Sequence, residues 1–292
     1  MHKKRILTSV CGTVLLLLMF PTLLPAQAFV MGSLPSFKPV NLGNARTLDD
    51  VLLEVRYQLN WRYEGDSQTH ADIRTVQIGR HLIYSRSESL YQNDSIATVQ
   101  LAKGAKGVQL YNTPVVPYEV VVDSQKKKMD IGYRVPFDNM LLMFEENTNT
   151  HQWDIKEEEK QEILGYSCTQ ATTYYRGQLV TAWFSESLPY NAGPYCFHGL
   201  PGLIMKVEMD GLSWNAVGLR KGKEKEHIYT YARPRQLMPR EKAVSFLARL
   251  YDDPVATFSA LGVECSNAQN PDITLTAGEL KWEKPELLIL EQ

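Results

Sequence analysis

The chain has 292 residues, with 31 basic and 33 acidic side chains and a formal net charge of −2. Nucleic acids and anionic membrane surfaces attract proteins with an excess of Lys and Arg, so we do not expect either as the main partner. The length is sufficient for a full hydrophobic core in one large domain or two small ones. No internal repeat or low-complexity linker is visible, which predicts a single domain over residues 29–292.

The first 28 residues have the features of an export signal. A basic start at residues 1–5 is followed by an apolar stretch, and the small-x-small sequence A-Q-A occupies residues 26–28. A retained membrane anchor is the alternative, because the stretch is almost long enough to cross a bilayer. Pro21 and Pro25 interrupt it, so we predict a cleaved signal peptide over residues 1–28. No later apolar run approaches 18 residues, and no transmembrane segment is expected after cleavage.

Period-two alternation dominates the first half of the mature chain. Residues 51–63 alternate apolar and polar side chains, which predicts a half-buried strand. Residues 73–78 and 82–84 predict two more strands joined by a bend, and residues 85–100 predict a short helix or a loop. Further strands are predicted over residues 118–122, 129–135, 140–144 and 152–155, with an exposed lysine-rich turn at residues 126–128.

Two hairpins and one helix are predicted in the second half. Residues 163–175 and 179–185 flank Arg176-Gly177, and residues 203–209 and 213–219 flank Asp210-Gly211, the strongest short hairpin signal in the chain. Apolar side chains at helical spacing predict a helix over residues 239–251, which Pro254 discourages from continuing. The charged run at residues 221–226 predicts a solvated turn, residues 228–232 another strand, and residues 287–290 an edge segment.

Short antiparallel strands with few helices indicate a mainly β (α+β) protein. Such a sheet must cover one face, either by closing into a barrel or sandwich or by curling around a helix. The amphipathic helix at residues 239–251 favours the second solution. We therefore predict a curled antiparallel sheet, or half-barrel, wrapped on one or two helices.

The most unusual string is G-L-P-G-L-I at residues 199–204. Two glycines and a proline within four positions require a tight turn, and the turn leads directly into a strand. A rigid packing corner explains this pattern on physical grounds alone. The functional alternative is a ligand groove in which the glycines leave room for a bound molecule and nearby aromatic side chains line the walls. The candidate residues for this site or corner are Trp183, Pro194, Tyr195, Phe197, Gly199, Leu200, Pro201 and Gly202.

Three cysteines remain after removal of the signal peptide, so at least one has no partner within the monomer. Export permits disulfides, and we predict a Cys168–Cys196 bridge, with Cys265 as the competing partner for either cysteine. A metal site at Cys196 and His198 needs two more ligands, and no second close pair is present. A Cys–His nucleophile is the other reactive interpretation. Motifs of serine hydrolases, zincins and phosphate loops are absent. We therefore predict no catalytic residue, cofactor or bound metal.

The segment around residues 160–210 resembles the GLPGLI family, uncharacterised exported proteins of Bacteroidota. The resemblance rests on I-L-G-Y-x-C at residues 163–168, A-W-F at residues 182–184 and the G-L-P-G-L-I string itself. Cys196 departs from the family's usual polar residue. The resemblance implies a periplasmic location and association with TonB-linked outer-membrane receptors, but no established activity. It also implies similarity to periplasmic lipoprotein-carrier folds, in which a curled sheet wraps a helix and holds an acyl chain.

Three functional hypotheses follow. The leading one is a non-catalytic periplasmic binding or chaperone-like protein that holds an apolar ligand or a protein segment near Trp183, Tyr195 and Phe197. The second is an accessory or assembly factor of an outer-membrane TonB-linked receptor, acting through an exposed sheet edge. The third is a metal- or thiol-dependent protein that uses Cys196 and His198.

Overall fold

The computed structural model describes residues 28–62, 67–111, 113–148 and 151–284. The predicted signal peptide lies outside these ranges except for Ala28, and so does the edge segment predicted at residues 287–290.

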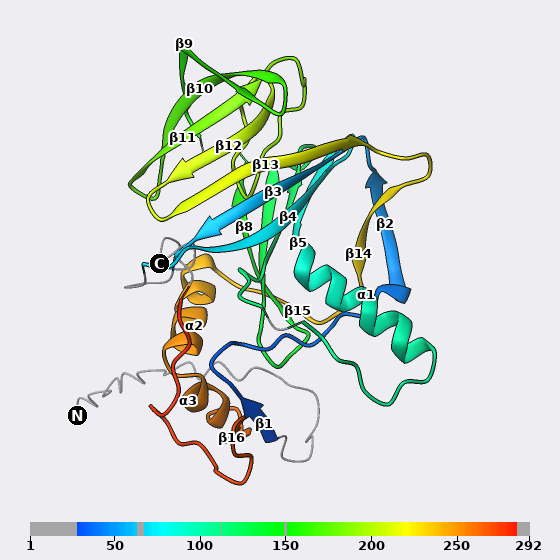
Figure 1. Ribbon diagram of the computed structural model, residues 1–292, viewed down its shortest axis with the longest axis vertical. Helices are drawn as coiled ribbons and strands as arrows, with labels where there is room; N and C mark the ends of the chain where they lie inside the picture. Colours follow the sequence, from blue (N-terminus) through cyan, green and yellow to red (C-terminus); the bar gives the residue numbers. More distant parts are fainter. Residues whose placement is uncertain (1–27, 63–66, 112, 149–150, 285–292) are drawn as a thin grey trace, which may run out of the picture.

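One large sheet of twelve strands organises the molecule (Figure 1). Its strands, in chain order, are β3 (Leu53–Trp61), β4 (His70–Ile78), β5 (Leu82–Ser87), β6 (Tyr118–Asp123), β7 (Lys128–Arg134), β8 (Leu141–Asn147), β9 (Asp154–Ile163), β10 (Tyr166–Tyr175), β11 (Gln178–Ser185), β12 (Leu203–Met209), β13 (Leu212–Lys221) and β15 (Arg235–Leu237). The order across the sheet is β15-β8-β7-β6-β5-β4-β3-β13-β12-β11-β10-β9. Neighbours are antiparallel except β15 and β8. The sheet is curled and does not close, which confirms the predicted fold class.

The predicted alternation determines which face of the sheet is buried. In β3 the side chains of Val55, Tyr57, Leu59 and Trp61 are all fully buried, and those between them are more exposed. Leu59 pairs across the sheet with Trp214 of β13, so both belong to the inner face. This face carries the main hydrophobic core.

Three α-helices of the described residues accompany the sheet: α1 (Glu88–Ala102), α2 (Arg240–Asp252) and α3 (Pro254–Ser259). Ser87 caps α1 by accepting a hydrogen bond from the Leu90 amide. The helix predicted over residues 239–251 is confirmed as α2, whose buried side chains, including Leu247 and Leu250, join the main core. Pro254 ends α2 as expected and then begins α3, which Asp253 caps.

Two further strand pairs lie outside the large sheet. β2 (Ala45–Asp50) and β14 (His227–Tyr231) form an antiparallel pair beside β5 (Figure 1). We call this pair of strands, β2 and β14, the arm. β1 (Ala28–Met31) runs parallel to β16 (Glu264–Asn267) near α3. The sequence patterns predicted β14 but no strand before residue 51. Both β1 and β2 were missed because each strand pairs with a segment more than 170 positions away in the chain.

The strand predicted over residues 163–175 begins later than expected, as β10 at Tyr166. Ile163 is the last residue of β9, and Leu164 and Gly165 adopt left-handed φ values of 52° and 80° and connect β9 to β10. A leucine seldom occupies this conformation, so the local sequence did not signal a turn there. By contrast, Arg176-Gly177 and Asp210-Gly211 form the predicted hairpin turns.

The predicted Cys168–Cys196 disulfide is wrong. Cys168, Cys196 and Cys265 are all buried thiols, and none of the cysteines in the described ranges forms a disulfide. The Cys168 Sγ donates to the carbonyl of Tyr166 at 3.4 Å. The three thiols pack in the main core as small apolar side chains. Burial raises the pKa of Cys168 to about 11, which keeps it protonated at neutral pH.

Candidate functional site

Tyr195 and Phe197, two of the predicted site residues, are buried in the concave side of the sheet. They are 2% and 1% exposed, and they belong to the irregular segment between β11 and β12. The Tyr195 ring lies 6.1 Å from Trp214 of β13 with an interplanar angle of 8°, and 5.0 Å from Tyr118 of β6. Both residues also contact Tyr175 of β10. Because β6 and β10 are far apart in the strand order, the sheet must curl around this segment, which fills its hollow.

Trp183 lies on the opposite face of the sheet. Its neighbours in β11, Ala182 and Phe184, are fully buried on the inner face. Successive side chains of a strand alternate between faces, so Trp183 points outward, opposite Lys206 of β12. The structure therefore does not bring Trp183 together with Tyr195 and Phe197.

The glycine corner at residues 199–204 is tightly packed. A Cβ at Gly202 would lie 2.2 Å from the backbone oxygen of Ser185, so only glycine fits there. Gly199 has a φ of 100°, and its amide donates to Asn191 Oδ1 at 2.6 Å. Leu200 and Pro194 are buried, whereas Pro201 is exposed. These contacts explain the motif as a packing corner, and a role for it in ligand binding stays a prediction.

His198 lies near a second histidine, His151, which the sequence did not single out. Their ring centroids are 6.0 Å apart, and His151 Nε2 donates to the carbonyl of Cys196 at 3.1 Å. Burial lowers the pKa of both side chains, to about 4 for His151. Over the described ranges, no group of three His, Cys, Asp or Glu side chains could hold a metal ion.

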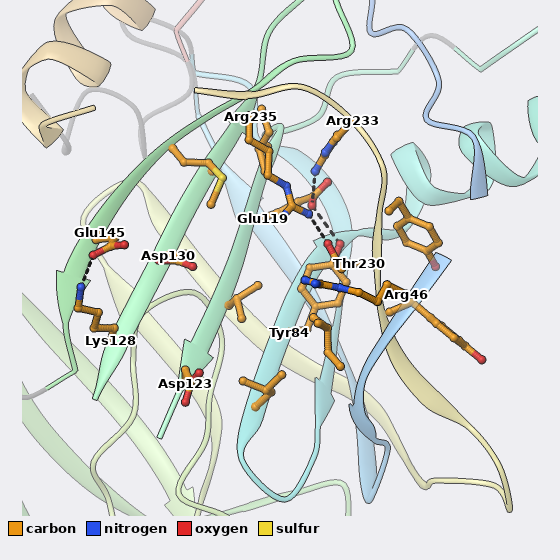
Figure 2. Close-up of a pocket in the computed structure, with 18 of the residues that line it drawn as sticks. Arg46, Tyr84, Glu119, Asp123, Lys128, Asp130, Glu145, Thr230, Arg233 and Arg235 are labelled. Carbon is orange, nitrogen blue, oxygen red and sulfur yellow. Dashed lines mark hydrogen bonds and ion pairs between the residues drawn. The ribbon is translucent and has the colours of Figure 1, made fainter. Parts of the chain in front are cut away.

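A cleft of about 680 Å³ opens on the outer face of the sheet, between strands β5–β8 and the arm (Figure 2). None of its residues was among the predicted site residues. Its apolar and aromatic lining includes Leu48, Leu82, Tyr84, Val121, Leu141, Met143, Tyr229 and Tyr231. Its charged lining is Arg46, Glu119, Asp123, Lys126, Lys128, Asp130, Glu145, Arg233 and Arg235.

Strand register places the floor residues in rows. Tyr84 of β5 pairs with Val121 of β6, Val121 with Asp130 of β7, and Asp130 with Glu145 of β8. These four side chains share the outer face, because directly paired residues point to the same side. Along this row, the floor of the cleft is therefore aromatic and aliphatic on β5 and β6 and carries carboxylates on β7 and β8.

A buried ion network closes one end of the cleft. Glu119 accepts a bond from Arg134 Nε at 3.0 Å and from the Tyr84 hydroxyl at 3.0 Å, and it also pairs with Arg233. Arg134 also donates two hydrogen bonds to Asp94, from Nη1 to Oδ1 at 2.9 Å and from Nη2 to Oδ2 at 2.6 Å. Burial alone would raise the pKa of Glu119, but Arg233 and Arg134 lower it to about 2. Glu119 is therefore ionised at neutral pH.

Other charges in the cleft divide into paired and unpaired groups. Lys126 pairs with Asp123 at 2.9 Å, and Lys128 pairs with Glu145. In the described part of the chain no ion pair within 4 Å involves Arg46, Arg235 or Asp130. Burial and the nearby Glu145 raise the pKa of Asp130. The cleft thus offers both signs of charge to a bound molecule, on opposite sides.

The architecture defines an open, curled, mainly antiparallel sheet protein with an arm-bounded cleft. A family described as "Protein of unknown function (Porph_ging)" matches residues 174–206, which cover the end of β10, β11, the whole glycine corner and the first residues of β12. This segment lies inside the region that resembles the GLPGLI family, although the matching family carries a different name.

Two solved structures are similar to part of the chain. The chain is similar to PNGF-II in two crystal forms, at 15% and 11% identity with TM-scores of 0.45 and 0.47. The similarity covers 65% and 68% of this chain but 31% and 33% of PNGF-II, so the chain spans about a third of that protein's length. No curated protein sequence matches the chain. Over the described residues, no helix is long and apolar enough to cross a membrane.

Proposed function

We propose that this protein is a non-catalytic binding protein of the cell envelope that holds a protein segment in the cleft between β5–β8 and the arm. The observation that carries the proposal is that Tyr195 and Phe197 fill the concave side of the sheet. These side chains leave no space on the concave side of the sheet for an acyl chain, which is where a lipoprotein-carrier fold would hold one. The cleft on the outer face is open, and its volume suits several side chains of an extended segment.

The composition of the cleft favours a polypeptide over a purely apolar ligand. Val121 and Met143 form an apolar floor, but Asp130 and Glu145 follow immediately on the same face. An acyl chain would bury the charge of Asp130, which has no ion-pair partner among the described residues, and burying an unpaired charge is costly. An extended polypeptide can direct apolar side chains to the floor and polar ones to the rim. The envelope location rests on the signal peptide expected at residues 1–28.

Native mass spectrometry of the protein purified from its own cells tests this proposal. Val121→Trp would fill the floor of the cleft, and Val217→Trp is the matched control because Val217 is 46% exposed on β13 and does not line the cleft. We expect peptide or protein adducts on the wild-type chain and on the Val217→Trp variant. The Val121→Trp variant should lose them while keeping the same unfolding transition.

Two results would contradict the proposal. One is a bound lipid in place of a peptide. The other is an adduct that the Val121→Trp variant retains in full, because the cleft would then not be the binding site.

A further inference from the structure

We infer that the arginine end of the cleft, formed by Arg46, Arg233 and Arg235, binds a carboxylate of the bound segment. This inference rests on the proposed function and specifies the chemistry that the cleft recognises. The three side chains come from β2, from the connection after β14, and from β15. Figure 2 shows Arg233 and Arg235 near Glu119, with Arg46 on the arm across from Asp130.

Arg233 carries an unsatisfied donor. Its side chain is 5% exposed and pairs with Glu119 through Nη2. Its Nη1 is buried and finds no hydrogen-bond partner in the described structure. A buried guanidinium nitrogen without an acceptor is unfavourable, and native proteins seldom leave one unexplained. An anion entering the cleft would supply the missing acceptor.

The local charge is also positive. Arg134 forms ion pairs with both Glu119 and Asp94, and Glu119 also pairs with Arg233. The two arginines and the two carboxylates therefore balance one another in charge. Arg46 and Arg235 add two positive charges with no carboxylate within 4 Å among the described residues. The Arg235 guanidinium donates to the Thr230 hydroxyl and to no other group among the described residues. Arginine presents several parallel donors, a geometry that matches a carboxylate.

The opposite side of the cleft favours a singly charged anion. Asp130 and Glu145 lie across the floor from Arg46, and Glu145 is already paired with Lys128 (Figure 2). A phosphate dianion would be repelled by Asp130, whereas a carboxylate on a segment that also carries a basic group would satisfy both sides. The carboxylate can come from an acidic side chain or from the C-terminus of the segment, and the experiment distinguishes these sources.

Isothermal titration with four probes tests the inference. The probes are a short acetylated, amidated peptide of alternating Val and Glu, its Val/Gln counterpart, the Val/Gln peptide with a free C-terminus, and inorganic phosphate. We expect at least one carboxylate-bearing peptide to bind about tenfold or more tightly than the amidated Val/Gln peptide, with a preference that weakens at high salt. Whichever peptide shows it identifies the source of the carboxylate.

Variants assign the preference to the arginines. The double substitution R46Q/R235Q changes two exposed side chains and should abolish the preference, while R56Q, an exposed arginine outside the cleft, should leave it unchanged. Equal binding of all peptides, or a preference that R46Q/R235Q retains, would overturn the inference but leave the proposed function standing. Phosphate binding without peptide binding would overturn the inference, and so would failure of every probe to bind; the native mass spectrometry of the purified protein tests the proposed function separately.

Discussion

At the scale of single residues, Glu119 is the side chain on which most of the charge balance of the cleft depends. It is almost fully buried and receives bonds from Arg134, Arg233 and Tyr84. Removing its charge would leave the buried side chains of Arg134 and Arg233 with fewer ion-pair partners. The loss of stability from leaving a buried charge unpaired exceeds the net stabilisation that a buried ion pair provides.

We expect Glu119→Gln to lower the free energy of unfolding by about 3 kcal/mol at pH 7. Urea denaturation measures this change, and Glu157→Gln on the exposed strand β9 is the control. The control should stay within about 0.5 kcal/mol of the wild type. A Glu119→Gln variant as stable as the control would mean that the network does not stabilise the fold.

The same residue predicts a pH dependence. The pKa of Glu119 is lowered from 4.5 to about 2 in the folded chain, so its ionisation stabilises the fold fully above pH 4.5. That contribution is lost as the pH falls from 4.5 toward 2. The stability gap between wild type and Glu119→Gln should therefore shrink over this interval, as urea titrations at several pH values would show. A gap that is constant with pH would contradict the assignment.

At the scale of elements, the turn between β9 and β10 stores backbone strain. Leu164 has a φ of 52° and its side chain is 47% exposed, so little packing compensates for the conformation. Leu164→Asn should stabilise the protein by about 1 kcal/mol, because Asn visits the left-handed region readily. Thermal unfolding measures this effect. Leu179→Asn, at an exposed position inside β11, should bring no gain; a gain of equal size there would point to a general effect of lower surface hydrophobicity.

In the glycine corner we expect a substitution to destabilise the protein, in contrast to the substitution at Leu164. Gly202→Ala places a methyl group against the Ser185 backbone and should cost about 2 kcal/mol through overpacking. Gly107→Ala is the control, since nothing lies within 4 Å of its Cβ position. The two variants are compared by chemical denaturation. Equal stability of the two would show that the corner can relax.

Strand signals in the chain were accurate where they were local. The Asp210-Gly211 turn and the alternation from Val55 to Trp61 correspond directly to the observed hairpin and to β3. The turn at Leu164 was missed because its conformation is imposed by the pairing of β9 with β10 and not by its own preference.

At the scale of the whole molecule, the cysteines that we predicted to form a disulfide are instead buried as free thiols in the hydrophobic core. Cys168, Cys196 and Cys265 are at most 1% exposed and lie in one core. In the chain without residues 1–28 we expect no thiol to react with a disulfide reagent in the native state and three to react after unfolding in denaturant. Intact-mass spectrometry provides a second check, since a mass two hydrogens short would show that two of the thiols have formed a disulfide.

The cleft is also a property of the whole molecule. Its residues come from β2, from β5 to β8 and the turn between β6 and β7, from β14 and from the chain after β14, so no contiguous motif describes it. The run from Tyr229 to Arg235 contributes two tyrosines and two arginines to the cleft, but the sequence predicted only a strand there, over residues 228–232.

The sequence by itself determined the β-rich class, most strands, helix α2 and the tight corner at residues 199–204, because alternation, helical periodicity and glycine-rich turns act over a few neighbouring residues. Only the tertiary structure decided which aromatic side chains face inward, that the hollow of the sheet is filled by Tyr195 and Phe197, and that an arm encloses a charged cleft. These features depend on the curl of the sheet and on pairing between distant segments. Such contacts are selected by the packing of the whole core, which no local pattern encodes.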